Sequence, residues 1–427
     1  TLKGEVKLHG EVGRDGEIAF RANILNSGRG LPGSVVLYTQ DPHERLYDRS
    51  LISGISYVGS AGEHWRIKAD MGFSSAWNRY VNTSPLYPEP LDDKYLQREC
   101  SLSAVALWKP REGWEVSIAQ DIWANTLDSN MEECPLPQRL SSVGAVSARW
   151  SSQRLSITSS LSATVMRERV RKGQPAPGRE RLSPSVSICW KVLEDRDLRL
   201  RASYREGFRV PTFNDLYYAR VGNVWLQPET SRQLNLGVGM LQPLDRGQIA
   251  VTADLHADKV HNKIVAIPTM FIWRMRNVGE AAMLGGDLSV RYDQRMDACT
   301  LHATAAWSYQ YAVDVTDPEA KNYRHQIAYA PRNSGSLSLA AETRPLTLSY
   351  TLVAVGERYS LAQNLPSYRM EPYLDHSLSL SREFRAGARA RILLSAQALN
   401  LTGRTYEVIK WYPMPGRNYR FTIKLTY

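Results

Sequence analysis

The segment Tyr419–Tyr427, with the sequence YRFTIKLTY, alternates strictly between apolar and polar residues. Its apolar positions are Tyr419, Phe421, Ile423, Leu425 and Tyr427, and its polar positions are Arg420, Thr422, Lys424 and Thr426. Because successive side chains of a β-strand point to opposite sides, this segment has one face for a non-aqueous phase and one face for water. The segment therefore predicts an amphipathic strand rather than a helix.

The same period of two recurs along the whole chain, in segments of about ten residues. Clear examples are residues 155–165, 198–205, 249–256 and 301–310, in which apolar residues alternate with polar or charged ones. We count about nineteen such segments and find no helical period. The pattern predicts an all-β chain.

The connections between these segments alternate between short turns and long polar loops. Residues 111–113 and 245–247 are short turns, whereas residues 82–94, 127–138 and 208–229 are long loops. In an up-and-down barrel of an outer membrane, short turns face the periplasm and long loops face the outside. Lipid cannot satisfy open strand edges, so membrane-spanning strands must close into a barrel. We therefore predict a transmembrane antiparallel up-and-down β-barrel, with a soluble all-β protein as the alternative.

The composition agrees with a membrane barrel. The chain has 11 Trp and 22 Tyr but only 7 Phe, and amphipathic rings of this kind form the girdles at the two membrane interfaces. No stretch approaches the ~20 apolar residues of a membrane-spanning helix, which excludes a helical membrane protein. The 4 Cys lie far apart, without the spacing of a zinc site. The formal charge of +10 is spread along the strands, which favours a basic lumen over nucleic-acid binding.

The longest loop contains a specific motif. Residues 204–229 read YREGFRVPTFNDLYYARVGNVWLQPE. This stretch resembles the signature of TonB-dependent outer-membrane receptors, in which an FRxPxxxxLY sequence precedes a GNxxLxPE sequence. The residues that carry the resemblance are Phe208, Arg209, Pro211, Asn214, Leu216, Tyr217, Gly222, Asn223, Leu226, Pro228 and Glu229.

The chemistry of these residues indicates an architectural role for the motif. Pro211 and Pro228 interrupt strand pairing, and Gly222 with Asn223 supplies a turn. The aromatic residues expected to pack the loop into an ordered structure are Phe208, Phe213, Tyr217, Tyr218 and Trp225. We expect the signature to shape and fold the loop, a role that requires no contact with a ligand.

Three further stretches are similar to the same family. They are residues 277–287 (NVGEAAMLGGD), residues 323–338 (YRHQIAYAPRNSGSLS) and residues 398–427, which look like the last two strands of the family. The chain ends on Tyr427, and the family uses an aromatic last residue for recognition by the outer-membrane assembly machinery. The N-terminal half resembles the family more loosely, through RGLPG at residues 29–33 and RLYD at residues 45–48.

The resemblance also implies parts that are not recognisable in residues 1–427. Family members carry an N-terminal plug domain and a short TonB-binding box, and their barrels have about 22 strands. We therefore expect residues 1–427 to form most of a receptor barrel, with the plug and the first strands absent or on another chain. The charged start at Thr1 is unlike a signal peptide, which indicates a mature or truncated chain.

The sequence carries no recognisable catalytic constellation, such as HExxH, a P-loop or a dinucleotide fingerprint. We therefore predict that the chain is not an enzyme. An outer-membrane hydrolase is the rival class, and its candidate pairs are His302 with Ser308 and His256 with Asp254.

The resemblance predicts energised import of a scarce nutrient. The GLPG, YYARVGN and YPMPGR stretches look most like cobalamin receptors and related ferric siderophore receptors, and a passive porin is the alternative. Flat rings suit a large corrin or catecholate surface, although they also suit an interfacial girdle. The aromatic loop residues that are candidate ligand contacts are Tyr80, Tyr87, Trp273, Tyr359 and Trp411.

Expected cofactors and partners follow from the same resemblance. We expect no intrinsic cofactor, except that cobalamin receptors can order their loops with calcium, for which Asp92 and Asp93 supply oxygen ligands. Expected partners are outer-membrane lipid and lipopolysaccharide, the TonB energising complex acting through a plug, and either a partner chain that completes the barrel or a surface lipoprotein. No nucleic-acid partner is expected, and the expected location is the Gram-negative outer membrane.

Overall fold

Most of the chain is β-strand in a computed structural model. The model describes residues 1–13, 15–31, 43–85, 89–193, 196–218, 221–268, 273–344, 346–387 and 390–426. Within these ranges, nineteen strands are assigned to one sheet, and two pairs of short strands form separate two-stranded sheets. This number agrees with the count from sequence alternation. Among the described residues, no helix is long and apolar enough to cross a membrane.

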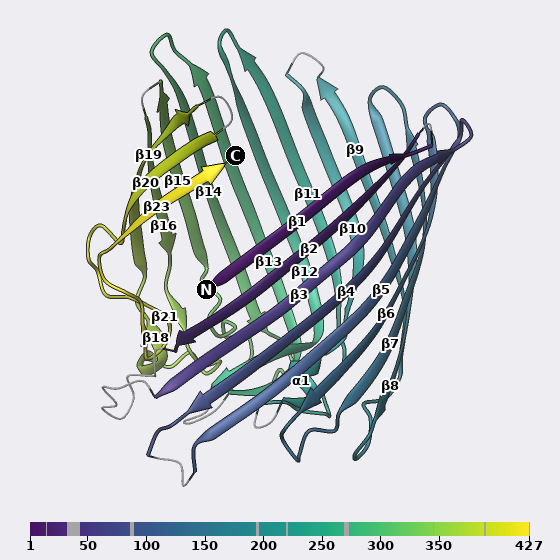
Figure 1. Ribbon diagram of the computed structural model, residues 1–427, viewed down its shortest axis with the longest axis vertical. Helices are drawn as coiled ribbons and strands as arrows, with labels where there is room; N and C mark the ends of the chain where they lie inside the picture. Colours follow the sequence, from purple (N-terminus) through teal and green to yellow (C-terminus); the bar gives the residue numbers. More distant parts are fainter. Residues whose placement is uncertain are drawn as a thin grey trace. The chain divides into compact units, whose positions relative to one another are not determined.

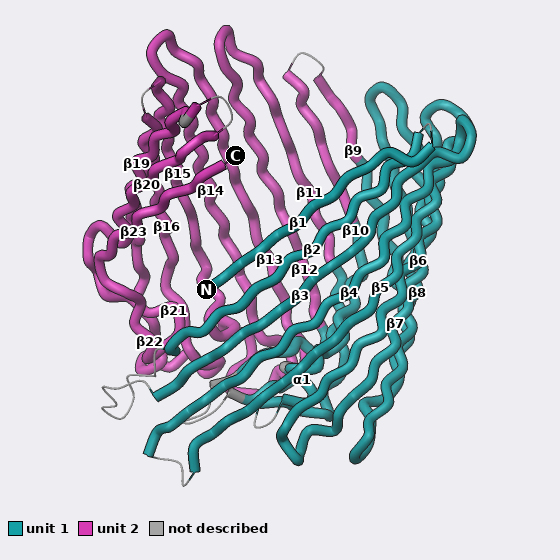
Figure 2. Tube along the Cα trace, in the orientation of Figure 1, with its two compact units in different colours: residues 1–188, 204–232, 261–278 teal, residues 189–203, 233–260, 279–427 magenta. Residues whose placement is uncertain are grey.

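Two compact units make up the chain, and Figure 2 colours them separately. Unit 1 comprises residues 1–188, 204–232 and 261–278, and unit 2 comprises residues 189–203, 233–260 and 279–427. Five long strands contribute residues to both sets: β9 (Arg179–Leu193), β10 (Leu198–Arg209), β11 (Glu229–Leu244), β12 (Gly247–Pro268) and β13 (Trp273–Arg295).

The first eight strands of unit 1 pair in chain order as antiparallel neighbours (Figure 1). They are β1 (Leu2–Val12), β2 (Gly16–Gly30), β3 (Glu44–Ala61), β4 (Trp65–Asn82), β5 (Leu91–Arg111), β6 (Trp114–Ser129), β7 (Pro137–Ser151) and β8 (Leu155–Val170). Short turns at residues 62–64, 112–113 and 152–154 alternate with longer loops at residues 83–90 and 130–136. This is the up-and-down order that the sequence predicts.

Strand register separates apolar and polar residues into rows that run across the sheet. Met71, Leu102 and Ile122 are direct neighbours on β4, β5 and β6, and their exposed fractions are 62%, 49% and 38%. The adjacent row places Ser103 beside Asp121. Large apolar side chains that remain exposed in register are expected where a sheet face contacts lipid.

We expect Leu102→Arg to destabilise the folded chain by about 2 kcal/mol in lipid vesicles, because a charged residue on the lipid face must be desolvated. Its neighbour provides the matched control, since Ser103→Arg places the same cation on the polar face and should change stability little. Urea titrations followed by tryptophan fluorescence measure both values. Equal losses in the two variants would contradict the assignment of faces.

In unit 2, six strands also pair with one another in chain order as antiparallel neighbours: β14 (Cys299–Asp314), β15 (Asn333–Thr343), β16 (Thr347–Val355), β19 (Tyr373–Ala386), β20 (Ala390–Leu399) and β23 (Asn418–Thr426). Two small hairpins lie within its long connections. They are β17 (Arg358–Tyr359) with β18 (Arg369–Met370), and β21 (Glu407–Ile409) with β22 (Tyr412–Pro413). A 3-10 turn, η2 (Pro366–Tyr368), precedes β18. Residues 419–426 of the last strand are all exposed, the apolar Phe421 and Ile423 as well as their polar neighbours.

The main buried hydrophobic cluster lies in unit 1, around the short helix α1 (Phe213–Tyr217) of the signature loop. Its buried members are Tyr95, Leu127, Cys134, Ala176, Phe213, Leu216, Tyr217, Leu226 and Ile264. These residues come from the loop and from the strand ends and loops that surround it. The signature loop is therefore a small folded structure with a core of its own.

Candidate functional site

Helix α1 begins with a capping box. The hydroxyl of Thr212 accepts a hydrogen bond from the Asp215 backbone N–H (3.2 Å), and the Asp215 carboxylate accepts one from the Thr212 backbone N–H (2.8 Å). Both interactions satisfy backbone donors that a helix start leaves unpaired. Pro211, which is fully buried, cannot continue strand β10 and directs the chain into the cap.

The signature arginine connects the helix to the next strand. Arg209 donates to the buried carboxylate of Asp215 and to the carboxylate of Glu229, each at 3.4 Å. The Glu229 carboxylate also accepts from the backbone N–H of Ile264 at 3.0 Å. One guanidinium thus links the end of β10, the helix and the start of β11, which explains the pairing of Arg and Glu in this motif.

The turn after the helix requires glycine at position 222. A Cβ atom there would lie 2.7 Å from the carbonyl carbon and oxygen of Leu216 and 2.8 Å from the Tyr217 nitrogen. The adjacent Asn223 completes the turn, because its backbone N–H donates to the Asp215 carbonyl (2.7 Å) and its side chain donates to the Met275 carbonyl (3.2 Å). The turn predicted at these two residues is confirmed.

Asn277 holds the far end of the loop. Its side chain accepts from the Gln227 N–H (2.9 Å) and donates to the carbonyls of Gln227 (3.0 Å) and Asn262 (2.7 Å). Asn277 is the first residue of the NVGEAAMLGGD stretch that is similar to the family. The structure gives that residue a role in closing the signature loop.

A buried ion pair lies beneath the helix. The guanidinium of Arg139 donates to the carboxylate of Glu168 (3.1 Å), their side chains are 11% and 0% exposed, and the Arg139 guanidinium carbon lies 4.7 Å from the centre of the Phe213 ring. Burial raises the pKa of Tyr217 to about 12, and its hydroxyl, which lies near the Glu168 carboxylate, accepts from the Ala176 N–H (3.2 Å). Strands β7 and β8 therefore contribute a cation and an anion that seat the loop, and the connection between β8 and β9 contributes a backbone donor.

The aromatic residues of the loop divide into two groups. Phe213 and Tyr217 are buried, Phe208 is half-buried, and the Tyr218 ring stacks on Tyr95 at 3.9 Å between ring centres. Trp225 is 78% exposed, so the expectation that it packs the loop is wrong. The backbone N–H of Trp225 donates to the Asn223 side chain, and the next residue, Leu226, fills the core instead. Among the other signature positions, Asn214 is exposed and Pro228 is half-buried.

A second cluster of aromatic and cationic side chains lies on the long loops of unit 2. The backbone N–H of Tyr329 donates to the Tyr359 carbonyl at 2.7 Å, and its hydroxyl accepts from the backbone N–H of Lys410. Burial raises the pKa of Tyr329, so the phenol stays neutral at physiological pH. Arg358, which is buried, donates to the backbone carbonyls of Glu371 and Glu407. These contacts tie the two small hairpins of unit 2 together.

Lys410 and Trp411 form the tip of the β21–β22 hairpin. The Lys410 ammonium lies 5.3 Å from the centre of the Tyr368 ring and 5.2 Å from that of Trp411, and it donates to the Ser367 carbonyl. Trp411 has a φ of 71° and is 51% exposed. A large residue in the left-handed region is strained, and such residues gather at binding and catalytic sites. The tip exposes the Trp411 ring and holds the half-buried Lys410 ammonium beside it.

The structure brings together two of the five predicted ligand contacts. Tyr359 and Trp411 belong to the unit 2 cluster and are linked through Tyr329 and Lys410. Tyr80 lies in β4 of unit 1, where its hydroxyl accepts from Asn82. Trp273 is the first residue of β13, and its side chain lies outside the described part of the chain, as does Tyr87.

The predicted calcium ligands lie at the start of β5. Asp92 accepts two hydrogen bonds from Arg79, at 2.6 and 2.9 Å, and pairs with Lys94 at 3.1 Å, while Asp93 is buried. Within the described ranges, no cluster of three or more His, Cys, Asp or Glu side chains is suited to a metal ion. Calcium binding stays a prediction. Tyr427, predicted as the assembly signal, lies outside the described residues.

The pairs considered for a hydrolase do not meet in the structure. His302 interacts with Asp293 at 2.7 Å, while Ser308 donates to Asp287. His256 interacts with Asp258 at 3.1 Å, while Asp254 accepts from Arg201 at 3.0 Å. A nucleophile requires a general base within hydrogen-bond reach, and neither pair meets that requirement.

Sequence reasoning missed Arg139, Glu168, Tyr329 and Lys410. Arg139 and Glu168 lie on neighbouring strands at a separation of 29 residues, and only strand register shows that they face each other. Tyr329 lies in the YAPR stretch that resembles the family, which is the one signal that pointed to it. Lys410 directly precedes Trp411, and an aromatic residue beside a cation in a long loop is a further signal that was present.

The sequence matches the family described as TonB dependent receptor-like, beta-barrel, over residues 14–401. The chain belongs to this family. The predicted TonB-dependent receptor barrel and its all-β antiparallel fold are thereby confirmed, together with the Gram-negative outer-membrane location of the family.

Similar proteins include two curated relatives with the same name. The chain is 23% identical over 230 residues to the vitamin B12 transporter BtuB of Vibrio vulnificus, a match that covers 52% of this chain and 34% of the relative. It is 23% identical over 227 residues to the vitamin B12 transporter BtuB of Photobacterium profundum, covering 53% and 35%. The chain spans about a third of the length of these curated relatives.

Solved structures of TonB-dependent receptors share the fold. The copper transporter OprC superposes with a TM-score of 0.77 at 15% identity, covering 99% of this chain and 71% of that one. The unliganded ferric citrate transporter FecA superposes with a TM-score of 0.78 at 11% identity, covering 99% and 70%. At such identities the likeness establishes the fold, and all four of these relatives are named as transporters.

Proposed function

We propose that this TonB-dependent receptor barrel binds cobalamin, or otherwise a ferric siderophore, at its extracellular loops for energised import. The observation that carries the proposal is the tip of the β21–β22 hairpin, where Trp411 is held in a strained, exposed conformation beside the Lys410 ammonium. Flat rings suit a corrin or a catecholate, and a cation suits the anionic groups of either ligand.

The choice of cobalamin as the first ligand is supported by the two curated relatives, both named as vitamin B12 transporters. The YPMPGR stretch that resembles cobalamin receptors begins at Tyr412, directly after the hairpin tip. Tyr359 lies in the same loop cluster and is the second aromatic contact that we propose. The signature loop has a different role in this proposal, since its polar residues bond within the loop's own fold.

Transport itself is part of the proposal. Import would be driven by the TonB energising complex acting through a plug, supplied by the same protein or by a partner chain, and a surface lipoprotein is a further candidate partner. We propose no catalytic activity: His302 and Ser308 each bond to a different aspartate, and so do not pair, and Asp254 accepts from Arg201 rather than bonding to His256.

Binding by the purified chain in detergent micelles tests the ligand. We expect saturable quenching of tryptophan fluorescence by cyanocobalamin with a nanomolar dissociation constant, as a scarce nutrient demands. Ferric catecholate, hydroxamate and citrate complexes are titrated in parallel. Saturation by one of these alone would replace cobalamin with that siderophore class, and the absence of saturation by all of them would favour a passive porin.

The variant Trp411→Ala is expected to weaken ligand binding about tenfold, because it removes an exposed aromatic contact at the centre of the proposed site. Trp190→Ala is the matched control, since Trp190 is also exposed (48%) but lies on β9 close to a short turn. Isothermal titration calorimetry measures both affinities. An equal loss in the two variants would show that Trp411 makes no specific contact.

A further inference from the structure

The apolar face of unit 2 contains a notch at the end of the sheet that carries the long loops. Strand register places Trp307, Gly335, Ala354 and Leu374 in one row across β14, β15, β16 and β19. Trp307 and Leu374 are exposed (49% and 42%), whereas the two residues between them have almost no side chain. Two large residues therefore flank a floor of glycine and alanine.

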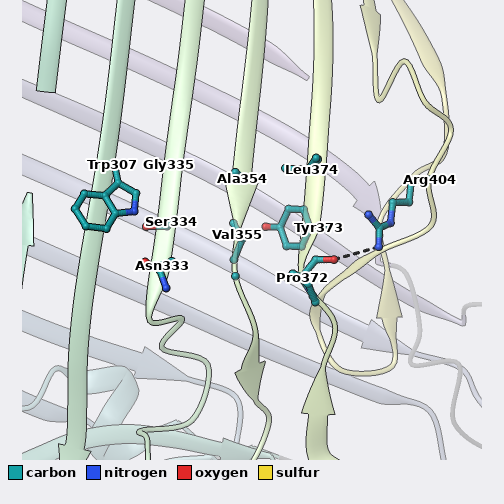
Figure 3. A pocket seen from close by; sticks show the side chains of 11 residues that line it. Trp307, Asn333, Ser334, Gly335, Ala354, Val355, Pro372, Tyr373, Leu374 and Arg404 are labelled. Atoms are coloured by element: carbon teal, nitrogen blue, oxygen red, sulfur yellow. Dashed lines mark hydrogen bonds between the residues drawn. The ribbon is translucent and has the colours of Figure 1, made fainter. Parts of the chain in front are cut away.

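This notch is part of a pocket of about 430 Å³ whose lining also includes Arg404. Figure 3 shows Trp307 on one side of the pocket, Ala354 near its middle, and Leu374 and Arg404 on the other side. The Arg404 guanidinium donates to the Pro372 carbonyl at 3.2 Å, which holds it at the rim. The pocket is apolar along its floor and cationic at one edge.

A second arginine lies next to the same face. Arg332 directly precedes Asn333, which lines the pocket, and its guanidinium carbon lies 5.5 Å from the centre of the Tyr311 ring. Its backbone carbonyl accepts from the Gln310 N–H at 2.8 Å. Within the described part of the chain, neither Arg332 nor Arg404 has a carboxylate partner. Two exposed guanidiniums thus remain available to an anion.

The apolar track below the notch has the length of one lipid chain. On β14, the residues that share the face of Trp307 continue to Leu301, and on β16 they continue to Leu348. Six residues of strand span about 20 Å, which is comparable to the ~15 Å half-thickness of a bilayer hydrocarbon core. A chain lying on this track would reach from the notch toward the middle of the membrane.

We propose that this notch binds a phosphorylated lipid of the outer leaflet, with an acyl chain over Gly335 and Ala354 and phosphate groups on Arg332 and Arg404. The forked guanidinium matches phosphate oxygens in geometry as well as in charge. Both arginines lie in long connections, at residues 315–332 and 400–417, and long connections face the outside in barrels of this kind. The proposal rests on the outer-membrane location and is independent of the transported ligand.

Native mass spectrometry of the full chain in neutral detergent tests the proposal, with lipid A, dephosphorylated lipid A and phosphatidylglycerol as probes. We expect one lipid A per chain, and much weaker retention of the other two lipids. The double variant Arg332→Gln, Arg404→Gln is expected to bind lipid A roughly 30-fold more weakly, because two surface cations are lost. Ala354→Phe, which fills the notch, is expected to bind it about tenfold more weakly.

Arg382→Gln is the matched control. Arg382 lies on β19, two residues from Leu380 and thus on the same apolar face, and its guanidinium carbon is 4.6 Å from the Phe384 ring. It is at the opposite end of the strand, so its loss should leave lipid A binding unchanged. Wild-type affinity in the double variant, an equal loss in the control, or equal binding of phosphatidylglycerol would each overturn the proposal. Circular dichroism checks whether each variant retains its β-structure, which we expect because the double variant alters exposed side chains only.

Discussion

Replacing Arg139 with alanine is expected to destabilise the folded chain by about 3–5 kcal/mol, because it leaves the Glu168 carboxylate buried without its cation. The Glu168 side chain is 0% exposed, so water cannot replace the lost partner. The variant also removes the guanidinium that lies 4.7 Å from the Phe213 ring, and so loosens the seat of helix α1. Equilibrium unfolding by guanidinium chloride in detergent micelles measures the loss.

An exposed pair of the same chemistry is the control for that variant. Arg98 and Asp128 form an ion pair at 3.1 Å, with side chains 49% and 42% exposed, and Arg98→Ala should cost at most about 1 kcal/mol. The double variant Arg139→Met, Glu168→Leu should recover most of the stability lost in Arg139→Ala, since a buried pair replaced by apolar residues of similar size is often neutral. Similar losses for Arg139→Ala and Arg98→Ala would show that burial of the pair has no effect.

The strands and their faces could be predicted from sequence because they rest on a period of two. Residues such as Phe421 and Ile423 alternate with polar neighbours, and pairing with any adjacent strand preserves that alternation. The order of short turns and long loops could be predicted as well, because these connections are the stretches between the alternating segments. Register could not, because one residue of slip along a strand changes every cross-strand partner, and the Arg139–Glu168 pair depends on register.

The signature loop shows where sequence reasoning stops. Its turn at Gly222 and Asn223 was predicted correctly from residue type, whereas the prediction that Trp225 packs the loop was wrong. An aperiodic loop has no repeating pattern to say which of two adjacent apolar residues faces the core, and here Leu226 does. The unit 2 cluster was predicted only through Tyr359 and Trp411, because the contacts of Tyr329 and Lys410 join loops that are distant in sequence.

The variant Gly222→Val is expected to destabilise the signature loop by about 3 kcal/mol or more, because its Cβ would lie within 2.8 Å of three backbone atoms. These atoms belong to Leu216 and Tyr217 at the end of helix α1, so a flexible side chain cannot move aside to relieve the contact. The helix and the turn must separate, which breaks the hydrogen bond between the Asn223 N–H and the Asp215 carbonyl. We expect limited proteolysis to cleave the loop at least tenfold faster than in the unmodified chain, since about 1.4 kcal/mol already corresponds to a factor of ten in the open population.

Gly416→Val is the control that separates steric conflict from the general effect of losing a glycine. No heavy atom lies within 4 Å of a Cβ built at Gly416, so this substitution should change neither stability nor cleavage of the signature loop. If Gly222→Val behaved like Gly416→Val, the close approach of the turn to the helix would not hold the loop together. If instead it opened the loop but left binding at Trp411 intact, the signature loop would be a structural element of the receptor, separate from its ligand-binding surface.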